Sequence, residues 1–203
     1  MSTDLQTRED SAATVASDPD RLLTAEEYAR FDDGYDGPTE LVDGRVIRMT
    51  QPSRVHGEVQ FWIGHLLINW GRSRGFKVAG ESGVVTRRSP DRVRGPDVMV
   101  YPAGLAYSGG SGFFEAPPIL CVEVASPSNS LPSLRVKADE YLAFGVKVVW
   151  LVLPSIRSVE VVTPEGRTLM AFDQTIPPHA DLPDLELPVA ELFAELPSEE
   201  VGD

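Results

Sequence analysis

Two apolar runs decide the fold of this 203-residue chain: Ile119-Leu-Cys-Val-Glu-Val-Ala125 and Val146-Lys-Val-Val-Trp-Leu-Val-Leu153. Residues 133–144 between them have a helical pattern, and Gly145 suits the C-terminal cap of that helix. Two strands joined through a helix pair in parallel. Strands this apolar are typical of a sheet covered on both faces. The sequence therefore predicts an α/β core built on a central parallel pair.

Glu123 is a carboxylate in the middle of the first run, between Val122 and Val124. Burying a charge without a partner costs on the order of several kcal/mol. The two-residue period of a strand puts Glu123 on the same side as Cys121 and Ala125, whose small side chains leave space for an ion. Two interpretations stay open: a metal-binding carboxylate, and a carboxylate paired with a structural Arg or Lys.

Asp97 follows Pro96 at the head of the strand expected over residues 98–101. Alone, such an aspartate is more typical of a turn. Together, Asp97 and Glu123 would place two carboxylates on neighbouring strands, which is the oxygen-rich kind of site that Mg²⁺ prefers. We therefore expect these two residues to be the metal ligands.

Lys137 is the third candidate, because it lies on one stripe of the expected helix with Leu134, Tyr141 and Phe144. An ammonium group that points inward beside two carboxylates could orient a water molecule or stabilise transition-state charge. The alternative is a side chain whose stem covers apolar surface while its charged end reaches solvent.

The remaining elements are expected on both sides of this centre. A capping box at Thr24 and Glu27 opens a short helix to about Phe31, and Asp43-Gly44 forms a hairpin turn. A final helix is expected over residues 189–196. Ser53 to about Arg74 is an amphipathic helix, and strands are expected at residues 76–79, 83–87, 96–101, 157–162 and 167–172, the last two as a hairpin that makes the sheet mixed.

The length and composition, with 42% hydrophobic and 24% charged residues, suit one folded domain, expected over residues 21–196. Residues 1–20 are polar and predict a disordered tail, and residues 197–203 a flexible one. The apolar runs are far shorter than the roughly 20 residues of a membrane span. We expect a cytoplasmic protein without membrane contact. Cys121, the single cysteine, is expected to be a buried packing residue.

The formal net charge of −13 argues against general nucleic-acid binding, because phosphate backbones attract basic surfaces. Seven basic residues nevertheless fall within one 23-residue stretch. This stretch predicts either a local basic surface or a set of solvated loop residues; its members are Arg72, Arg74, Lys77, Arg87, Arg88, Arg92 and Arg94.

Other chemistries have weaker support. Ser126 lacks the Gly-X-Ser-X-Gly context of a hydrolase nucleophile, so a capping or phosphate-binding role is expected. The three histidines are scattered and have no cysteine partners for a zinc site, and no nucleotide-binding glycine motif is present. A two-carboxylate glycosidase is disfavoured by the lysine between the acids and by the lack of an aromatic sugar platform.

Several motifs in order resemble the Uma-type restriction endonuclease family of bacteria, once classed as a domain of unknown function, within the PD-(D/E)XK nuclease superfamily. The resemblance covers about Leu23 to Phe193. The motifs are Glu40-Leu-Val-Asp-Gly, Pro52-Ser-Arg-Val-His56, Pro96-Asp-Val, Val122-Glu-Val-Ala-Ser-Pro-Ser128, Lys137 with Glu140-Tyr141, Gly145-Val146, Val149-Trp-Leu-Val152 and Leu185-Glu-Leu-Pro-Val-Ala-Glu-Leu-Phe193.

The resemblance implies a restriction-endonuclease-like, three-layer α/β core with a mixed sheet flanked by helices. It implies an Mg²⁺ site at Asp97 and Glu123, with Mn²⁺ as a substitute. The superfamily's Glu-X-Lys pattern would need lysine at position 125, where this chain has alanine; in the Uma-type pattern Lys137 takes that place. Three accessory residues are expected: Glu81, His56 and Tyr141. Either Glu81 or His56 would add a further ligand or base.

These features predict a metal-dependent endonuclease that hydrolyses phosphodiesters in nucleic acid, with DNA as the expected substrate. A homodimer is expected, because enzymes that cut both strands with one site per chain commonly act in pairs. The alternative is a non-catalytic module that keeps the fold and binds nucleic acid or protein.

Overall fold

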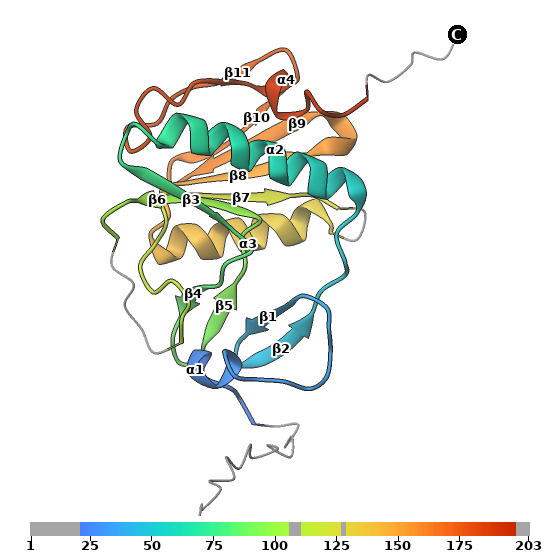
Figure 1. The fold of residues 1–203 in the computed structure, drawn as a ribbon, viewed down its shortest axis with the longest axis vertical. Coiled ribbons are helices and arrows are strands. Elements are labelled where there is room, and N and C mark those ends of the chain that lie inside the picture. Colours follow the sequence, from blue (N-terminus) through green and yellow to red (C-terminus); the bar gives the residue numbers. More distant parts are fainter. Residues whose placement is uncertain (1–20, 106–110, 127–128, 198–203) are drawn as a thin grey trace, which may run out of the picture.

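A six-stranded mixed sheet forms the centre of the molecule in this computed structural model, which describes residues 21–105, 111–126 and 129–197 (Figure 1). The strand order is β10-β9-β8-β7-β6-β3. As predicted, β7 and β8 pair in parallel, and the other neighbours are antiparallel. The strands are β3 (Phe76–Gly80), β6 (Val98–Pro102), β7 (Leu120–Val124), β8 (Val148–Leu153), β9 (Ser158–Thr163) and β10 (Gly166–Met170).

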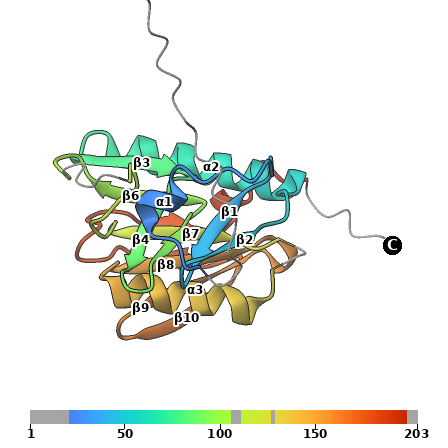
Figure 2. The same ribbon diagram turned by 90° about the horizontal axis from the view of Figure 1, so that it is seen from below.

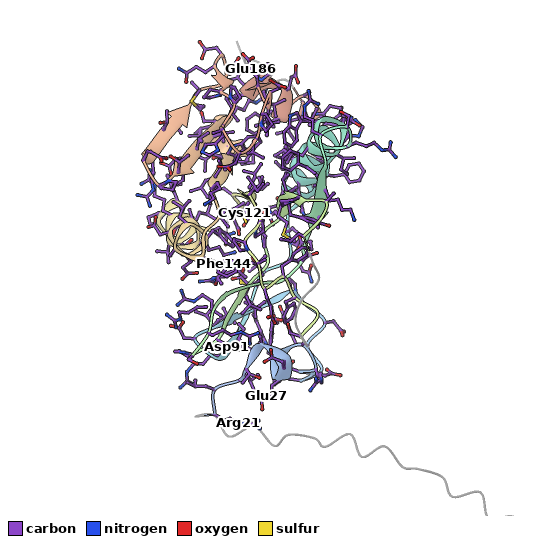
Figure 3. All side chains as sticks on the ribbon, turned by 90° about the vertical axis from the view of Figure 1, so that its left-hand side faces the viewer. Arg21, Glu27, Asp91, Cys121, Phe144 and Glu186 are labelled. Carbon is purple, nitrogen blue, oxygen red and sulfur yellow. The ribbon has the colours of Figure 1, made fainter. Side chains whose placement is uncertain are left out.

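Helices cover both faces of this sheet. Figure 2 shows the sheet between α2 (Arg54–Gly71) and α3 (Leu131–Phe144), which gives the three layers expected from the sequence. Alternate residues of β7 face the two helices: Val122 packs in the core on the α2 side, and Cys121 in the core on the α3 side. Figure 3 places Cys121 between the two helices, buried as predicted.

The C-terminal segment completes the α2 side of the sheet. Ile176, Leu187 and Leu192 pack in the same core as Val59 of α2. Its elements are short: η1 (Pro154–Ile156), β11 (Thr175–Ile176), β12 (Leu187–Pro188) and α4 (Val189–Leu192). The eight-residue helix expected at residues 189–196 is therefore wrong in length, because the chain leaves the helical conformation at Phe193.

A second sheet, with the order β2-β1-β5-β4, lies beside the first and carries α1 (Figure 1). The sequence predicted one sheet and missed β5, whose Arg-Val-Arg pattern resembles a solvated loop. In the structure Arg92 and Arg94 are ion-paired and largely buried. The elements are α1 (Ala25–Tyr28), β1 (Thr39–Val42), β2 (Arg45–Arg48), β4 (Val84–Arg87) and β5 (Arg92–Arg94).

Local signals set most element ends. The capping box of Thr24 and Glu27 is present, although α1 ends at Tyr28, before the expected Phe31. Asp43 and Gly44 both have positive φ in the β1–β2 turn, and Gly145 caps α3 with a φ of 113°. The capping role considered for Ser126 belongs instead to Ser130, which starts α3 earlier than expected.

No helix in the part of the chain described here is long and apolar enough to cross a membrane. The tail expected at residues 1–20 lies outside the described residues, as does all but the first residue of the tail expected at residues 197–203.

Candidate active site

Two neighbouring strands position Asp97 and Glu123. The antiparallel register of β6 and β7 pairs Val98 with Val122 and Met99 with Cys121. Asp97 directly precedes β6, so extending this register by one residue sets it opposite Glu123. Because side chains alternate along a strand, both residues share the sheet face of Met99 and Cys121, which α3 covers.

Lys137 points inward from α3, with its side chain 12% exposed, so its ammonium does not reach out to solvent. Its Nζ lies 3.2 Å from Oε2 of Glu123 and 2.9 Å from Oε1 of Glu40. The Tyr141 hydroxyl donates a 2.7 Å hydrogen bond to the other oxygen of Glu123. Glu123 is therefore buried and paired with a lysine, as the second interpretation expected, whereas the metal-binding interpretation stays a prediction.

Asp97 is held through one oxygen. Its Oδ2 accepts a 2.6 Å hydrogen bond from the Val124 backbone N–H and lies 3.2 Å from Nε2 of His56. His56 stands in the first turn of α2, whose N-cap is Ser53. Both contacts found among the described residues fall on Oδ2, so Oδ1 is the oxygen available to a cation.

Glu81 lines the same cleft, where Gln60 holds its side chain by a hydrogen bond. The Gln60 amide donates to Oε1 of Glu81 at 2.8 Å and to the Asp97 backbone carbonyl at 3.0 Å. The backbone of Glu81 has a φ of 50°, a left-handed conformation that is uncommon for residues with a Cβ. Of the three accessory candidates, His56 contacts Asp97, Tyr141 contacts Glu123, and Glu81 lines the same cleft and is linked to Asp97 only through Gln60.

Glu40 is a site residue to which the sequence assigned no role, although it opens the first of the family motifs. It lies in β1, is 4% exposed, and binds Lys137 and also Arg94, whose Nη1 donates at 2.6 Å. A glutamate in a hairpin arm is ordinarily solvated, so nothing local indicated its burial. Its burial is explained by two cations from distant parts of the chain, Arg94 of β5 and Lys137 of α3.

Burial and neighbouring charge shift the ionisation of these groups. Burial raises the pKa of Glu123 to about 7; the charges of Asp97 and Glu40 add to the rise, while Lys137 and Tyr141 oppose it. For Glu40, burial is outweighed by Lys137 and Arg94, which lower its pKa. The pKa of Lys137 is raised despite burial, because two carboxylates surround it. Lys137 therefore stays a cation at neutral pH.

His56 also favours its charged form. Burial acts against protonation, but the contact with Asp97 and the charges of Glu81 and Glu123 raise its pKa above the ordinary value. Its Nδ1 is buried and has no hydrogen-bond partner within the described ranges. A protonated His56 would hold Asp97 in place as a donor.

A cleft of about 390 Å³ joins these side chains at the boundary between the two sheets. Acidic and basic groups share its lining with an apolar wall that includes Tyr28, Phe31 and Phe113. The ionisable lining residues are Glu40, His56, Glu81, Arg94, Asp97, Glu123 and Lys137.

The donor set fits Mg²⁺ better than a metal that needs a full protein cage. Among the described residues, no group of three or more His, Cys, Asp or Glu side chains is placed to hold a metal ion. Mg²⁺ is usually bound by one or two carboxylates, with waters and substrate phosphates as the other ligands. Asp97, through its available oxygen, and Glu123 match that pattern, whereas zinc would need more protein ligands.

The arginines of β4, β5 and the turn between them do not form the basic surface considered from the sequence. Arg87 pairs with Asp43; Arg88 pairs with Glu26, Asp91 and Glu115. Arg92 and Arg94 share Glu140, and each has a second carboxylate partner. Both interpretations, basic surface and solvated loop, are wrong for Arg92 and Arg94, which are largely buried and join the second sheet to Glu140 of α3. Arg87 and Arg88 are exposed but ion-paired, so they too are not free to form a basic surface.

The other reactive side chains lie outside the arrangement or are inert. His65 stacks on Trp62, and His179 lies beside Asp181. Burial raises the pKa of the Cys121 thiol, which rules against a thiolate nucleophile. Ser126 is the exception, because it lines the cleft.

A family model named Uma2, with the description "Putative restriction endonuclease", matches residues 25–190. Among solved structures, the chain is similar to one described as a putative nuclease belonging to DUF820 from Anabaena variabilis ATCC 29413. The identity is 20% and the TM-score 0.72, and the alignment covers 85% of this chain and 98% of that chain. At this identity the likeness shows a shared fold and confirms the expected α/β architecture. No curated protein matches the chain.

Proposed function

Because this chain belongs to the Uma2 family of restriction endonucleases, we propose that it is an Mg²⁺-dependent endonuclease that hydrolyses phosphodiester bonds in nucleic acid, foremost DNA. One observation carries the proposal: two carboxylates face each other across neighbouring strands at a cleft, and an inward lysine touches one of them. A carboxylate buried on a central strand is costly, and a metal-binding role accounts for its presence.

In this proposal Asp97 and Glu123 hold the cation, which activates a water molecule and neutralises phosphate charge when bound. The water oxygen bonds to phosphorus, one P–O ester bond breaks, and the departing oxygen takes up a proton. The products are a phosphomonoester and a free hydroxyl. Mn²⁺ would support the same reaction, because it also prefers carboxylate and water ligands.

Lys137 supplies the positive charge on the protein side. Its ammonium orients the attacking water or stabilises the charge that builds on the phosphoryl oxygens. His56 fixes Asp97 through Oδ2, and Tyr141 fixes Glu123 through its hydroxyl. Glu81, held by Gln60, is available as an additional ligand through the metal's water shell or as a base.

The test separates binding from catalysis. Purified protein should cleave DNA with Mg²⁺ or Mn²⁺ and lose activity on chelation. Asp97→Asn and Glu123→Gln should lose Mn²⁺ binding in calorimetry together with cleavage. Lys137→Ala should keep metal binding but lose about 100- to 1,000-fold in rate, equivalent to about 3 to 4 kcal/mol. Metal binding that survives both carboxylate substitutions would refute the assignment.

A non-catalytic module that binds nucleic acid or protein is the second candidate. The formal charge of −13 and the ion-paired arginines favour it, because both weaken attraction to a phosphate backbone. If single- and double-stranded DNA and RNA all remain uncut at low ionic strength while Mn²⁺ still binds, the module replaces the enzyme.

We further propose that the protein is bacterial and cytoplasmic and acts as a homodimer from a single domain over residues 21–196. Two copies would let one site per chain cut both strands of a duplex. Sedimentation equilibrium of the purified chain tests the dimer.

A further inference from the structure

We propose that Glu40 is a positioning residue of the nuclease reaction: it keeps the Lys137 ammonium in the cleft when Glu123 turns its carboxylate to the metal. This inference rests on the proposed function, because it assigns a role within that site. The observation behind it is that one ammonium lies between two buried carboxylates, and that Glu40, at 2.9 Å, is the nearer of the two.

Both oxygens of Glu123 already have a partner. Its Oε1 accepts from the Tyr141 hydroxyl at 2.7 Å, and its Oε2 contacts Lys137 at 3.2 Å. A divalent cation bound to this carboxylate would repel the nearby ammonium of Lys137. Tyr141 is a neutral donor with 0% exposure, fixed in the core, so Lys137 is the partner that gives way.

Without a second anchor, a displaced ammonium would leave for solvent, because a lysine stem has four rotatable bonds and water solvates its charge strongly. Glu40 provides that anchor from a different element. It is on β1 in the second sheet, not on the β6 and β7 strands of the first sheet beside which Asp97 and Glu123 lie.

Glu40 is itself held firmly. Its Oε2 accepts a 2.6 Å hydrogen bond from Arg94, and its Oε1 accepts one from the Gly95 backbone N–H at 3.3 Å. Arg94 is braced in turn by Glu140 of α3 at 2.7 Å. The carboxylate therefore has little freedom to follow Lys137 away from the cleft.

Glu40 keeps its negative charge beside the lysine. Lys137 and Arg94 outweigh burial and lower the pKa of Glu40, so its carboxyl group stays ionised at neutral pH. This agrees with the geometry, in which Glu40 holds the lysine while Glu123 exchanges partners.

The test uses Glu40→Gln in the full chain, with Glu160→Gln as the matched control. Glu160 is also 4% exposed and bound by an arginine, Arg135, but it lies on β9 and does not line the cleft. Both substitutions remove a buried, ion-paired carboxylate while keeping its shape. Circular dichroism melting checks that each variant folds.

Three results are expected for Glu40→Gln. The cleavage rate at saturating Mg²⁺ falls at least tenfold, while Mn²⁺ affinity by calorimetry changes less than threefold. In Lys137→Ala the further change Glu40→Gln costs less than twofold, since its target is already gone. Glu160→Gln retains activity within twofold. Equal rate losses in Glu40→Gln and Glu160→Gln, or additive losses with Lys137→Ala, would overturn the proposal.

A spectroscopic readout keeps the inference testable if no activity is found. The Lys137 ammonium signal, assigned by its loss in Lys137→Arg, should persist in ¹⁵N NMR of the wild-type protein after Mg²⁺ is added. In Glu40→Gln the same addition should abolish it through exchange with water. A signal that survives Mg²⁺ in Glu40→Gln refutes the anchor, whereas absent cleavage with the expected NMR result refutes only the nuclease.

If Glu40→Gln does not fold, the wild-type protein still decides the question. In ¹³C NMR of protein labelled at glutamate, Mg²⁺ should shift the carboxyl signal of Glu123. The carboxyl signal of Glu40 should stay where it is without metal. A shift at Glu40 equal to that at Glu123 would make Glu40 a metal ligand and overturn its role as anchor.

Discussion

A carboxyl group that ionises near neutral pH is the unusual feature at the residue scale. Burial raises the pKa of Glu123 to about 7, although Lys137 contacts it at 3.2 Å. An ordinary glutamate ionises near 4.3. The folded chain therefore binds a proton at Glu123 over a pH range in which the unfolded chain has released it, and this difference links folding to pH.

Because the folded pKa of Glu123 is raised, its contribution to stability is full below the unfolded pKa and is lost as pH rises toward about 7. Glutamine does not titrate, so Glu123→Gln should not show this loss. The free energy of unfolding of the variant, relative to that of the wild-type protein, should therefore rise by up to about 3 kcal/mol between pH 4.5 and 7. Urea unfolding at several pH values, without metal, measures the difference; a constant gap across this range would contradict it.

The residues of the site differ in how far they could be predicted from the sequence. Glu123 could be identified because a charge inside an apolar strand is costly. Lys137 could be placed because helical periodicity sets which residues share a face. Glu40 could not, because its burial depends on Arg94 and Lys137, which come from distant parts of the chain. Local patterns carry no information about such long-range ion pairs.

At the scale of elements, Asp91 ties the N-terminal helix to the second sheet. Its Oδ2 accepts a hydrogen bond from the Ala25 backbone N–H at 2.8 Å, and its Oδ1 accepts one from Ser89 at 3.1 Å. Arg88 adds an ion pair at 2.7 Å. Figure 3 shows Asp91 beside α1, near Glu27. One carboxylate thus connects the helix start with the β4–β5 turn.

Asp91→Asn should therefore destabilise the fold by about 1 to 3 kcal/mol, because it leaves buried donors poorly satisfied. Asp139→Asn is the control, since Asp139 also pairs with an arginine but is 61% exposed. Denaturant unfolding should show a change below about 1 kcal/mol for this exposed pair. Equal effects of the two substitutions would show that the anchor is unimportant.

Asp91 also predicts the acid response. Despite burial, the Ala25 and Ser89 backbone donors and Arg88 lower its pKa. A lowered pKa stabilises the fold above the unfolded pKa, and this stability is lost as pH falls through the folded value. The gap in stability between the wild-type protein and Asp91→Asn should accordingly shrink below about pH 4.

Elements with one strong local signal were predicted correctly. The β7–α3–β8 unit followed from two apolar runs and a capping glycine, and the β9–β10 hairpin from its turn. The short β5 was missed, and α4 was predicted too long, because three or four residues hold too little periodicity to fix a conformation. The second sheet depends on pairings between β1 and β5 that are 52 residues apart at Leu41 and Val93.

At the scale of the whole molecule, the proposed homodimer needs a surface, and the outer face of α2 offers one. Phe61 is 81% exposed and Ile68 49% exposed. Gly57 and Gly64 lie on the same stripe, and a Cβ at either would meet nothing within 4 Å. Exposed apolar residues with small neighbours suit close helix packing.

Phe61→Glu should therefore shift the proposed dimer to monomer, with at least a tenfold rise in the dissociation constant measured by sedimentation equilibrium. Val136→Glu is the control, because Val136 is 55% exposed on α3, across the sheet from α2. A dimer that tolerates Phe61→Glu but not Val136→Glu would move the interface to the α3 side.

The charge of the whole molecule limits how substrate is held. Four of the seven basic residues in the Arg72–Arg94 stretch pair with carboxylates. The remaining three, Arg72, Arg74 and Lys77, follow the far end of α2, and Arg72 is about 24 Å from His56 at 1.5 Å per helical residue. Among the described residues, this stretch therefore leaves few cations to neutralise phosphates near the cleft, and the proposed metal would supply much of the attraction.

Substrate binding should accordingly depend weakly on salt. For each phosphate that the protein neutralises, a plot of the logarithm of the association constant against the logarithm of the salt concentration gains a slope of about −0.9. Three or fewer phosphate contacts therefore give a slope no steeper than about −3. Fluorescence anisotropy with a labelled duplex, and Ca²⁺ in place of Mg²⁺ to prevent cleavage, measures it between low and moderate NaCl. Arg72→Gln should leave the slope unchanged because of its distance from the cleft. A slope steeper than about −5 would mean that the arginine pairs open on binding and contact the backbone themselves.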